Sequence, residues 1–464
     1  MQARKFPTSR KLMLWIGDIL LIALAYIVAN NIITDGEFLR GNIYPYSGVM
    51  SLLVVLTILL LNVNGLYSIE HKRFAEIMLS TVVANLCSFV LILSLGFFIQ
   101  ELSYSVGILG MGIILQTVLL IVWRYLGWWV EQEIHQRRNV MLMGSQEECD
   151  HVYQRLRKQP QLNLKLKYIC TDIEQSEWQK AADDVEVVIL CPELRHRYKV
   201  AVINYCHQNG KEALLIPNTY EIFCAGVELD KIDDIPVFRP QSLVPSLETR
   251  IMKRLLDIVV SGIGFICALP FMVVTAIAIK IFDPGPMLYS QIRTGRDGKE
   301  FRVYKFRTMK VDAEKYTGPM LAQENDPRIT RLGKFLRAVR LDELPQIWNV
   351  VIGDMSIVGP RPERPFFVEQ FTKETPEYAY RHNVKPGITG MAQVYGKYNT
   401  TAFDKLVYDL TYIERCNILT DFVIMIQTVK VLFTKSATEG MRGRQVSLDV
   451  DEYDIINNGY KEIK

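Results

Sequence analysis

Two adjacent carboxylates, Asp342 and Glu343, lie among cationic residues in the second half of the chain. Such a pair suits phosphoryl chemistry, because one carboxylate can attack phosphorus while the other holds a divalent metal that neutralises phosphate charge. Mg²⁺ is typically bound by one or two protein carboxylates together with phosphates and water. Adjacent acids also occur elsewhere, as at Glu147-Glu148. The residues around Asp342 and Glu343 must therefore indicate whether this pair takes part in a reaction.

The segment that leads to this pair is strongly basic. Its cations recur at every third position: Arg328, Arg331, Lys334, Arg337 and Arg340. Apolar residues between them follow the i, i+3, i+4, i+7 spacing of one helical face: Leu332, Phe335, Leu336 and Val339. A helix with a cationic face and an apolar stripe is typical of a membrane interface and attracts phosphate. A solvated helix packed on a core would show the same pattern, but the apolar run at 258–279 favours the interface.

Two Gly/Pro-rich loops follow the pair. Residues 353–362 (GDMSIVGPRP) form a rigid loop that presents Arg361, and residues 385–390 (KPGITG) form a second one. A guanidinium that is held in a fixed geometry can bind a phosphate through two hydrogen bonds. These loops predict anion binding close to Asp342 and Glu343.

Apolar stretches near the N-terminus predict membrane helices. They cover residues 12–33, 44–63, 77–99 and 105–130, and each is close to the ~20 residues that cross a bilayer as a helix. Basic residues occur in the N-terminal segment and in every second loop between these stretches. This pattern predicts that the N-terminus and everything after residue 131 are cytoplasmic. Asp18 lies about two turns into the first stretch, and we expect it to have a structural role near the interface.

Residues 139–240 alternate short apolar runs with helical patterns, which favours a parallel α/β sheet. Strands are expected at 139–144, 164–170, 185–191 and 212–216. A dinucleotide site would need a G-x-G-x-x-G turn after the first strand, but residues 144–149 read GSQEEC. Because this turn has one glycine and two acids where a pyrophosphate would approach, we expect a sheet with a structural or regulatory role.

A fifth apolar run, residues 258–279, is long enough to span a bilayer. Basic residues precede it at Lys253 and Arg254 and follow it throughout 291–310, so both ends are expected on the same side. Pro270 lies near its middle, where it would bend a helix. We therefore predict a helix that enters the membrane, breaks near Pro270 and returns. The alternative is a kinked fifth span, which would place the basic segment outside.

The composition excludes several classes of protein. The chain has 464 residues, is 49% hydrophobic and has a mean hydropathy of +0.11. Its charged residues are sparse over 11–130 and dense elsewhere, which excludes a uniformly soluble, a fully embedded and a disordered protein. The eight cysteines show neither zinc-site nor disulfide-framework spacing.

Residues 253–433 resemble the bacterial sugar transferase family of monotopic polyprenyl-phosphate phosphoglycosyl transferases. The motifs follow in order as KRxxD at 253–257, the central proline, YKFRTM at 304–309, LDELPQ at 341–346 and the two Gly/Pro loops. The whole chain is similar to long-form members that initiate exopolysaccharide, capsule, O-antigen or surface-layer glycan synthesis. Arg340 departs from the family pattern, which often has Ser or Thr there.

The expected organisation is that of a mixed membrane protein. It has a four-helix transmembrane bundle at 1–138, a Rossmann-like α/β domain at 139–240, a linker at 241–250, a mainly α catalytic domain at 251–435 with a re-entrant helix at 254–281, and a tail at 436–464.

The resemblance implies transfer of a hexose-1-phosphate, glucose or galactose by default, from a UDP-sugar to undecaprenyl phosphate, with release of UMP. Asp342 would be the nucleophile of a phosphosugar-aspartyl intermediate and Glu343 the Mg²⁺ ligand. Substrate-binding residues would be Lys305, Arg307, Arg337, Arg361 and Lys385. Structural residues would be Pro270, Lys253, Arg254 and Asp257.

The expected partners are the two substrates, the bilayer and a second copy of the chain, with no nucleic acid. The location would be the bacterial inner membrane, with the catalytic domain on its cytoplasmic face. Two other functions remain open. A scaffold or regulator of glycan assembly would not need Asp342 and Glu343. A membrane-tethered nucleotide-sugar oxidoreductase would need the glycine fingerprint that this chain lacks.

Overall fold

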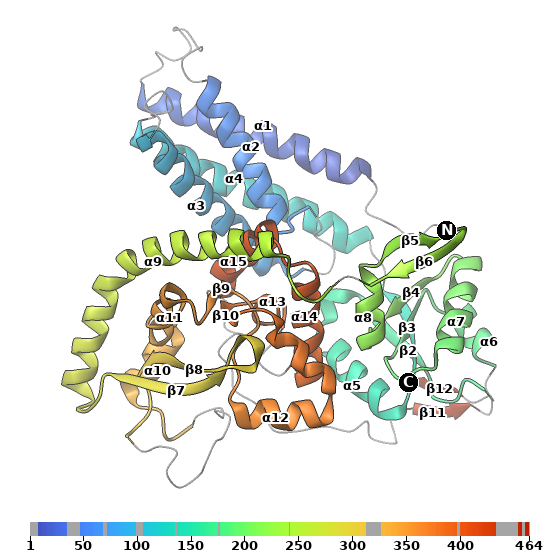
Figure 1. The fold of residues 1–464 in the computed structure, drawn as a ribbon. Helices are drawn as coiled ribbons and strands as arrows, with labels where there is room; N and C mark the ends of the chain where they lie inside the picture. The colour runs from blue at the N-terminus through green and yellow to red at the C-terminus, as the bar shows by residue number, and fades with distance from the viewer. Residues whose placement is uncertain are drawn as a thin grey trace. The chain divides into compact units, whose positions relative to one another are not determined.

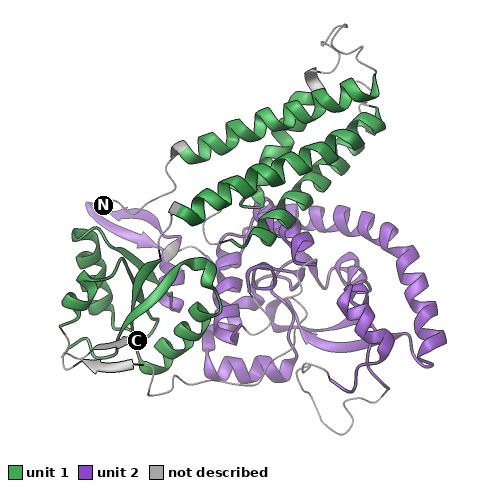
Figure 2. Cartoon of the chain, turned by 180° about the vertical axis from the view of Figure 1, so that it is seen from behind, with its two compact units in different colours: residues 1–216, 445–464 green, residues 217–444 purple. Residues whose placement is uncertain are grey.

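The structure is a computed structural model. It describes residues 8–34, 47–67, 72–98, 105–134, 137–174, 177–240, 242–311, 326–396, 400–432, 453–456 and 460–463. The chain divides into two compact units (Figure 2). One contains residues 1–216 and 445–464, and the other contains residues 217–444.

Apolar helices form the first part of the chain, as predicted (Figure 1). They are α1 Thr8–Ile33, α2 Ser47–Val63, α3 Phe74–Phe98 and α4 Val106–Ile134. Among the described residues, α1, α3 and α4 are long and apolar enough to cross a membrane, and α2 is a shorter apolar helix. Many of their large apolar side chains are exposed, as expected for helices that face lipid.

A buried ion pair ties α1 to α4. Arg124 donates from Nη2 to Oδ2 of Asp18 at 2.5 Å, and both side chains are fully buried. The hydroxyl of Tyr67 donates to the same carboxylate at 2.7 Å, and Nη1 of Arg124 donates to the carbonyl of Leu66 at 2.8 Å. This arrangement is consistent with the structural role predicted for Asp18, because the charge is paired inside the bundle rather than exposed.

The α/β domain contains the predicted parallel sheet. Its strands β1 Arg138–Met143, β2 Leu164–Cys170, β3 Val187–Leu190 and β4 Glu212–Leu215 lie in the order β2-β1-β3-β4. The helices are α5 Gln146–Arg157, α6 Trp178–Asp183 and α7 His196–Gln208, with a short 3₁₀ turn at Pro160–Leu162. Helices α6 and α7 cover one face of the sheet and α5 covers the other.

The C-terminal segment joins this sheet. Strands β11 Tyr453–Ile456 and β12 Tyr460–Ile463 form a hairpin, and β12 pairs with β2 in antiparallel register. The sequence predicted only a tail over 436–464. The described part of that tail is instead an extension of the sheet edge, and residues 433–452 lie outside the described part of the chain.

The second unit contains a long helix, α9 Leu247–Phe282, whose apolar side chains are largely exposed. Its other helices are α8 Thr219–Ala225, α10 Arg331–Ala338, α11 Gln346–Ile352, α12 Pro365–Glu374, α13 Met391–Tyr395, α14 Ala402–Glu414 and α15 Ile418–Leu432. Its 3₁₀ helices are η5 Arg296–Gly298, η6 Leu341–Glu343 and η7 Pro376–Asn383. The strand pairs are β5 Glu228–Ile232 with β6 Ile235–Arg239, β7 Leu288–Thr294 with β8 Glu300–Phe306, and β9 Ser356–Val358 with β10 Gly387–Thr389. This unit is mainly helical, as expected.

Helix α9 differs from its prediction in two ways. It begins at Leu247, inside the segment expected to be a linker, and it remains one continuous helix with Pro270 inside. Figure 1 shows α9 changing direction along its length, so the predicted break is a bend within the helix. The missing N–H and the ring of a proline account for such a bend. Among the described residues α9 is also long and apolar enough to cross a membrane, so its re-entrant course stays a prediction.

The N-terminal part of α9 is anchored by the KRxxD motif. Lys253 is buried and contacts the carboxylate of Asp421, the hydroxyl of Tyr412 at 2.7 Å and the carbonyl of Val358 at 3.3 Å. Arg254 donates to the carbonyls of Val350 and Val351, at the end of α11, at 2.7 and 2.9 Å.

Asp257 completes this anchor one turn further along α9. It accepts hydrogen bonds from the hydroxyl of Ser356 at 2.9 Å and the amide of Ile357 at 2.8 Å. Since positions i, i+1 and i+4 share one side of a helix, the motif fixes α9 to α11, β9 and α15 at once.

Replacing Lys253 with Met is expected to destabilise the second unit by about 3–5 kcal/mol, because the Asp421 carboxylate stays buried without its counter-charge. The urea midpoint of the purified full-length protein measures this loss. Lys299→Met removes an exposed lysine of the same unit and should shift the midpoint little. Equal midpoints for the two variants would show that the Lys253 contacts contribute nothing.

Candidate active site around Asp342 and Glu343

Asp342 and Glu343 lie on η6, directly after α10. The side chain of Thr330 caps α10 by accepting from the amide of Gly333 at 3.0 Å. A Cβ at Gly333 would fall 2.1 Å from the carbonyl oxygen of Thr308, so only glycine lets α10 approach the chain that leaves β8. Arg340 then adopts a left-handed φ of 59° and turns the chain into η6.

The predicted cationic helix exists, but its apolar face is divided. Leu332 and Leu336 pack with Ile279 of α9 and Phe306 of β8, whereas Phe335 is 59% exposed. Val339 is also exposed. The helix therefore packs on the core and also leaves apolar surface open beside basic side chains, so its place at a membrane interface stays a prediction.

Glu343 is held by cations. Its Oε1 accepts from Lys305 and from Arg361, each at 3.0 Å, and Arg340 lies 3.8 Å from its Oε2. Although burial opposes ionisation, Lys305, Arg361 and Arg340 hold the pKa of Glu343 well below its usual range. Glu343 is therefore a fixed negative charge.

Asp342 has the opposite character. It is 8% exposed, and its Oδ1 is buried without a hydrogen-bond partner among the described residues. Burial, followed by the charge of Glu343, raises the pKa of Asp342, while Lys305 and Arg337 oppose the shift. An unpartnered carboxylate oxygen beside cations keeps the lone pairs that a nucleophile needs.

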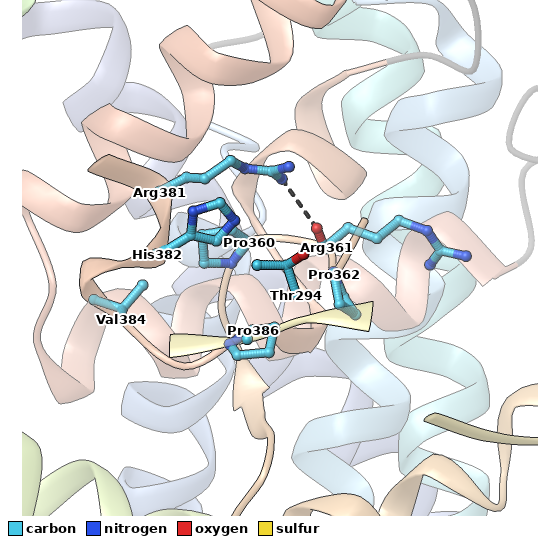
Figure 3. Close-up of a pocket in the computed structure, with 9 residues that line it drawn as sticks. Thr294, Pro360, Arg361, Pro362, Arg381, His382, Val384 and Pro386 are labelled. Carbon is cyan, nitrogen blue, oxygen red and sulfur yellow. Dashed lines mark hydrogen bonds between the residues drawn. The ribbon is translucent and has the colours of Figure 1, made fainter. Parts of the chain in front are cut away.

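The loop at 353–362, which carries Arg361, is held in place by side chains of other elements. Arg381 donates from Nη2 to the backbone carbonyl of Arg361 at 3.0 Å and to the buried carboxylate of Asp409 at 2.7 Å. Figure 3 shows this bond in a small pocket beside His382, with the guanidinium of Arg361 directed away from the pocket. On the other side Arg293 donates to the carbonyl of Pro362 at 3.1 Å. The backbone of the loop is thus fixed while the Arg361 side chain reaches Glu343.

The two Gly/Pro loops lie side by side, as β9 and β10 form a parallel pair. The amide of Gly359 donates to the carbonyl of Thr389 at 2.8 Å, and that of Gly387 donates to the carbonyl of Pro360 at 2.9 Å. A Cβ at Gly359 or Gly387 would fall 2.3 or 2.1 Å from backbone atoms of the other loop. Glycine is therefore required at both positions.

The predicted phosphate contacts separate into two groups. Lys305, Arg337 and Arg361 lie at the acid pair, where Arg337 also donates to the hydroxyl of Thr308 at 2.9 Å. Arg307 does not join them. It is buried against the carbonyl of Asp283 after α9, and its Nε and Nη1 have no hydrogen-bond partner among the described residues.

Lys385 also lies elsewhere. Its neighbours are Arg254, Asp257 and the loop at Gly353. Burial, followed by the charge of Arg254, lowers the pKa of Lys385. Proximity in the sequence to a Gly/Pro-rich loop could not show which cations face the acid pair, because neighbouring side chains leave a loop in different directions.

Sequence reasoning missed Arg381 and Asp409. The available signal was Asp409 itself, which falls between Leu406, Leu410 and Ile413 on the buried face of α14. An acid at such a position must be paired to be tolerated. The pattern can reveal the buried acid but not its partner, which comes from η7.

The acid pair fits a metal only in combination with a substrate. Among the described residues no group of three or more His, Cys, Asp or Glu side chains could hold an ion. One or two carboxylates plus phosphates and water are, however, what Mg²⁺ commonly takes. The Oε2 of Glu343, which lies 3.8 Å from a guanidinium nitrogen of Arg340, is the atom that fits this role.

Comparisons with known proteins match two segments of the chain. The profile of the bacterial sugar transferase family matches residues 248–435, which include α9 and the acid pair. The profile of a family described as a CoA-binding domain matches residues 62–195.

Several curated proteins are similar to this chain. UDP-glucose:undecaprenyl-phosphate glucose-1-phosphate transferase of Klebsiella pneumoniae is 34% identical over 330 residues, which are 65% of this chain and 70% of that protein. UDP-N-acetylgalactosamine-undecaprenyl-phosphate N-acetylgalactosaminephosphotransferase of Aeromonas hydrophila is 42% identical over 207 residues, 44% of this chain and 49% of that protein. The Caulobacter vibrioides protein with the same name as that of Klebsiella is 37% identical over 215 residues, 45% of this chain and 79% of that protein. The chain thus spans about half the length of the Aeromonas relative and more of the other two. By this similarity and the matched profile, the chain belongs to the bacterial sugar transferase family.

Proposed function

We propose that this protein transfers a hexose-1-phosphate, glucose or galactose, from a UDP-sugar to undecaprenyl phosphate and releases UMP. The product would begin the assembly of a surface glycan, and the protein would act as a homodimer. The names of the relatives support the reaction class: four are glucose-1-phosphate transferases, one is an N-acetylgalactosaminephosphotransferase, and one from Streptococcus agalactiae is a galactosyl transferase. The single observation that carries the proposal is that Oδ1 of Asp342 has no hydrogen-bond partner within the described part of the chain and lies beside a Glu343 that cations hold in place.

The proposed mechanism has two displacements. A carboxylate oxygen of Asp342 attacks the phosphorus that carries the sugar, the bond to the UMP oxygen breaks, and UMP leaves. An oxygen of undecaprenyl phosphate then attacks the same phosphorus and releases Asp342 as a carboxylate. Splitting the transfer in this way lets the soluble product leave before the lipid phosphate enters.

Cations around Asp342 neutralise the charge that develops on the transferred phosphate. Arg361 and Lys305 approach from the Glu343 side, and Arg337 approaches from α10. Charges that are positioned before the reaction stabilise the transition state without reorganisation. Glu343 would hold Mg²⁺, which would supply further neutralisation of the diphosphate.

A panel of UDP-sugars tests the proposal directly. Purified full-length protein with undecaprenyl phosphate and Mg²⁺ should release UMP from UDP-glucose or UDP-galactose. UDP-N-acetylgalactosamine and UDP-N-acetylglucosamine are the competing donors in the same panel. Turnover with an N-acetylated donor alone would correct the sugar, and no UMP from any donor would refute the reaction.

The face of the membrane can be tested by labelling. We propose that the catalytic unit lies on the cytoplasmic face of the bacterial inner membrane, so a cysteine in place of Glu300 should resist an impermeant maleimide in intact cells. The protein that receives each new cysteine should also carry Cys267→Ser, because Cys267 is exposed on α9 and could react with the maleimide itself. A cysteine at position 36, in a loop that the charge pattern predicts to be external, is the positive control. Labelling at position 300 would show that α9 crosses the membrane.

A further inference from the structure

The α/β domain has the topology of a ligand-binding sheet. Strand β1 lies between β2 and β3, so the connections from β1 and β2 lead to opposite sides of the sheet. In such sheets ligands bind at the carboxyl ends of the strands where the strand order reverses, with phosphate on the following helix N-terminus. The match to a family described as a CoA-binding domain covers residues 62–195, which include β1, β2 and β3.

At this edge a carboxylate of the chain occupies the phosphate position. Glu148, in the first turn of α5, accepts at Oε2 from the amide of Ser145 at 3.0 Å and from its hydroxyl at 2.9 Å. Its Oε1 accepts from the amide of Glu193, which follows β3, at 3.0 Å. The amides of Ser145 and Glu193, which flank the space between β1 and β3, therefore both donate to Glu148 within the chain.

The backbone at this edge is also closed to a ligand. A Cβ at Gly144, the last residue before the cap of α5, would fall 2.5 Å from Cβ of Cys191 and 3.0 Å from Oε2 of Glu148. In a dinucleotide site glycine gives the pyrophosphate access to the backbone. Here that space is filled by the side chains of Cys191 and Glu148.

The charges around this edge disfavour an anionic ligand. Acids follow the carboxyl ends of three neighbouring strands: Glu147, Glu148, Asp172, Glu174 and Glu193. The nearby cations Arg195 and Arg197 both pair with Glu174. A ligand with several phosphate charges would meet net negative charge here.

We infer that the α/β domain binds neither CoA nor a dinucleotide at this edge, because Glu148 takes the place of the ligand's phosphate. Glu148 is a built-in anion that joins the β1–α5 turn to the loop after β3, and the fold keeps the architecture of the site without its ligand. The domain then contributes to the protein as a rigid body.

Hydrogen–deuterium exchange of the full-length protein in detergent tests both parts of this inference. With CoA or NAD⁺ at about 1 mM, which would fill about half of a site of millimolar affinity and nearly all of a site of micromolar affinity, exchange over residues 139–150 and 187–196 should not change. Protection of these segments by either compound would overturn the inference. If CoA or NAD⁺ binds without protecting these segments and UDP displaces it, the binding site lies in the second unit. That result agrees with the inference.

Variants test the role of Glu148 without any ligand. Glu148→Ala should speed exchange at the amides of Ser145 and Glu193 by roughly tenfold or more, since both lose their acceptor. Glu148→Gln keeps the size and one acceptor oxygen, so it should give a smaller increase. The matched control is Glu147→Ala, which removes an exposed acid from the same turn and should leave both amides protected. Exchange in Glu148→Ala that equals the control would overturn the bridging role.

Discussion

Replacing Asp342 with Asn is expected to lower UMP release from the UDP-sugar by roughly 10⁴-fold or more, as the loss of a covalent nucleophile commonly does. The amide is nearly the same size as the carboxylate, so the fold should be preserved. Because both half-reactions pass through Asp342, the loss should appear with and without undecaprenyl phosphate. Intact-mass measurement of the wild-type protein with the UDP-sugar alone should show one added hexose phosphate, and the Asp342→Asn protein should show none.

The matched control is Asp297→Asn, which changes an exposed acid on η5 of the same unit. Asp297 has a φ of 57°, a conformation that Asn also tolerates, so this variant should keep both the rate and the mass adduct. If the Asp342→Asn protein releases UMP at the wild-type rate, Asp342 is not the nucleophile. A wild-type protein that turns over without any adduct would instead favour direct transfer between the two substrates.

The parts of the fold that follow from local patterns were predictable. The strands of the α/β sheet alternate with helices and are continuous apolar runs, so their positions agree with the structure to within a few residues. The apolar N-terminal helices follow from hydropathy alone. The cationic helix before Asp342 follows from its spacing, although it is shorter than the pattern.

The remaining features depend on contacts between distant residues. Arg307 and Arg361 both lie in basic motifs, yet one caps the turn after α9 and the other reaches Glu343. The C-terminal hairpin extends a sheet whose strands lie about 300 residues earlier, and no local pattern specifies that pairing. A re-entrant helix was expected to break near Pro270, but α9 continues through this residue, since the loss of one hydrogen bond is tolerated where neighbouring turns remain intact.

Breaking the buried pair behind the Arg361 loop is expected to have the second largest effect. Arg381→Met leaves the Asp409 carboxylate buried without its counter-charge and removes the donor to the carbonyl of Arg361. The first loss should cost about 3–5 kcal/mol of stability. The second should free the loop and lower kcat by roughly tenfold or more, since small displacements of a positioned cation weaken transition-state stabilisation. Urea unfolding and UMP release measure the two effects on the same protein.

The double variant Arg381→Met/Asp409→Leu separates these effects. It removes both charges, so no unpaired ion remains and most of the lost stability should return. The carbonyl of Arg361 still lacks its donor, so kcat should stay low. KM for the UDP-sugar should change by a smaller factor than kcat. A double variant that regains activity together with stability would mean that Arg381 acts only through the fold. Low activity in a protein of near wild-type stability would identify Arg381 as a positioning residue, which acts on the transferred phosphate through the backbone of Arg361.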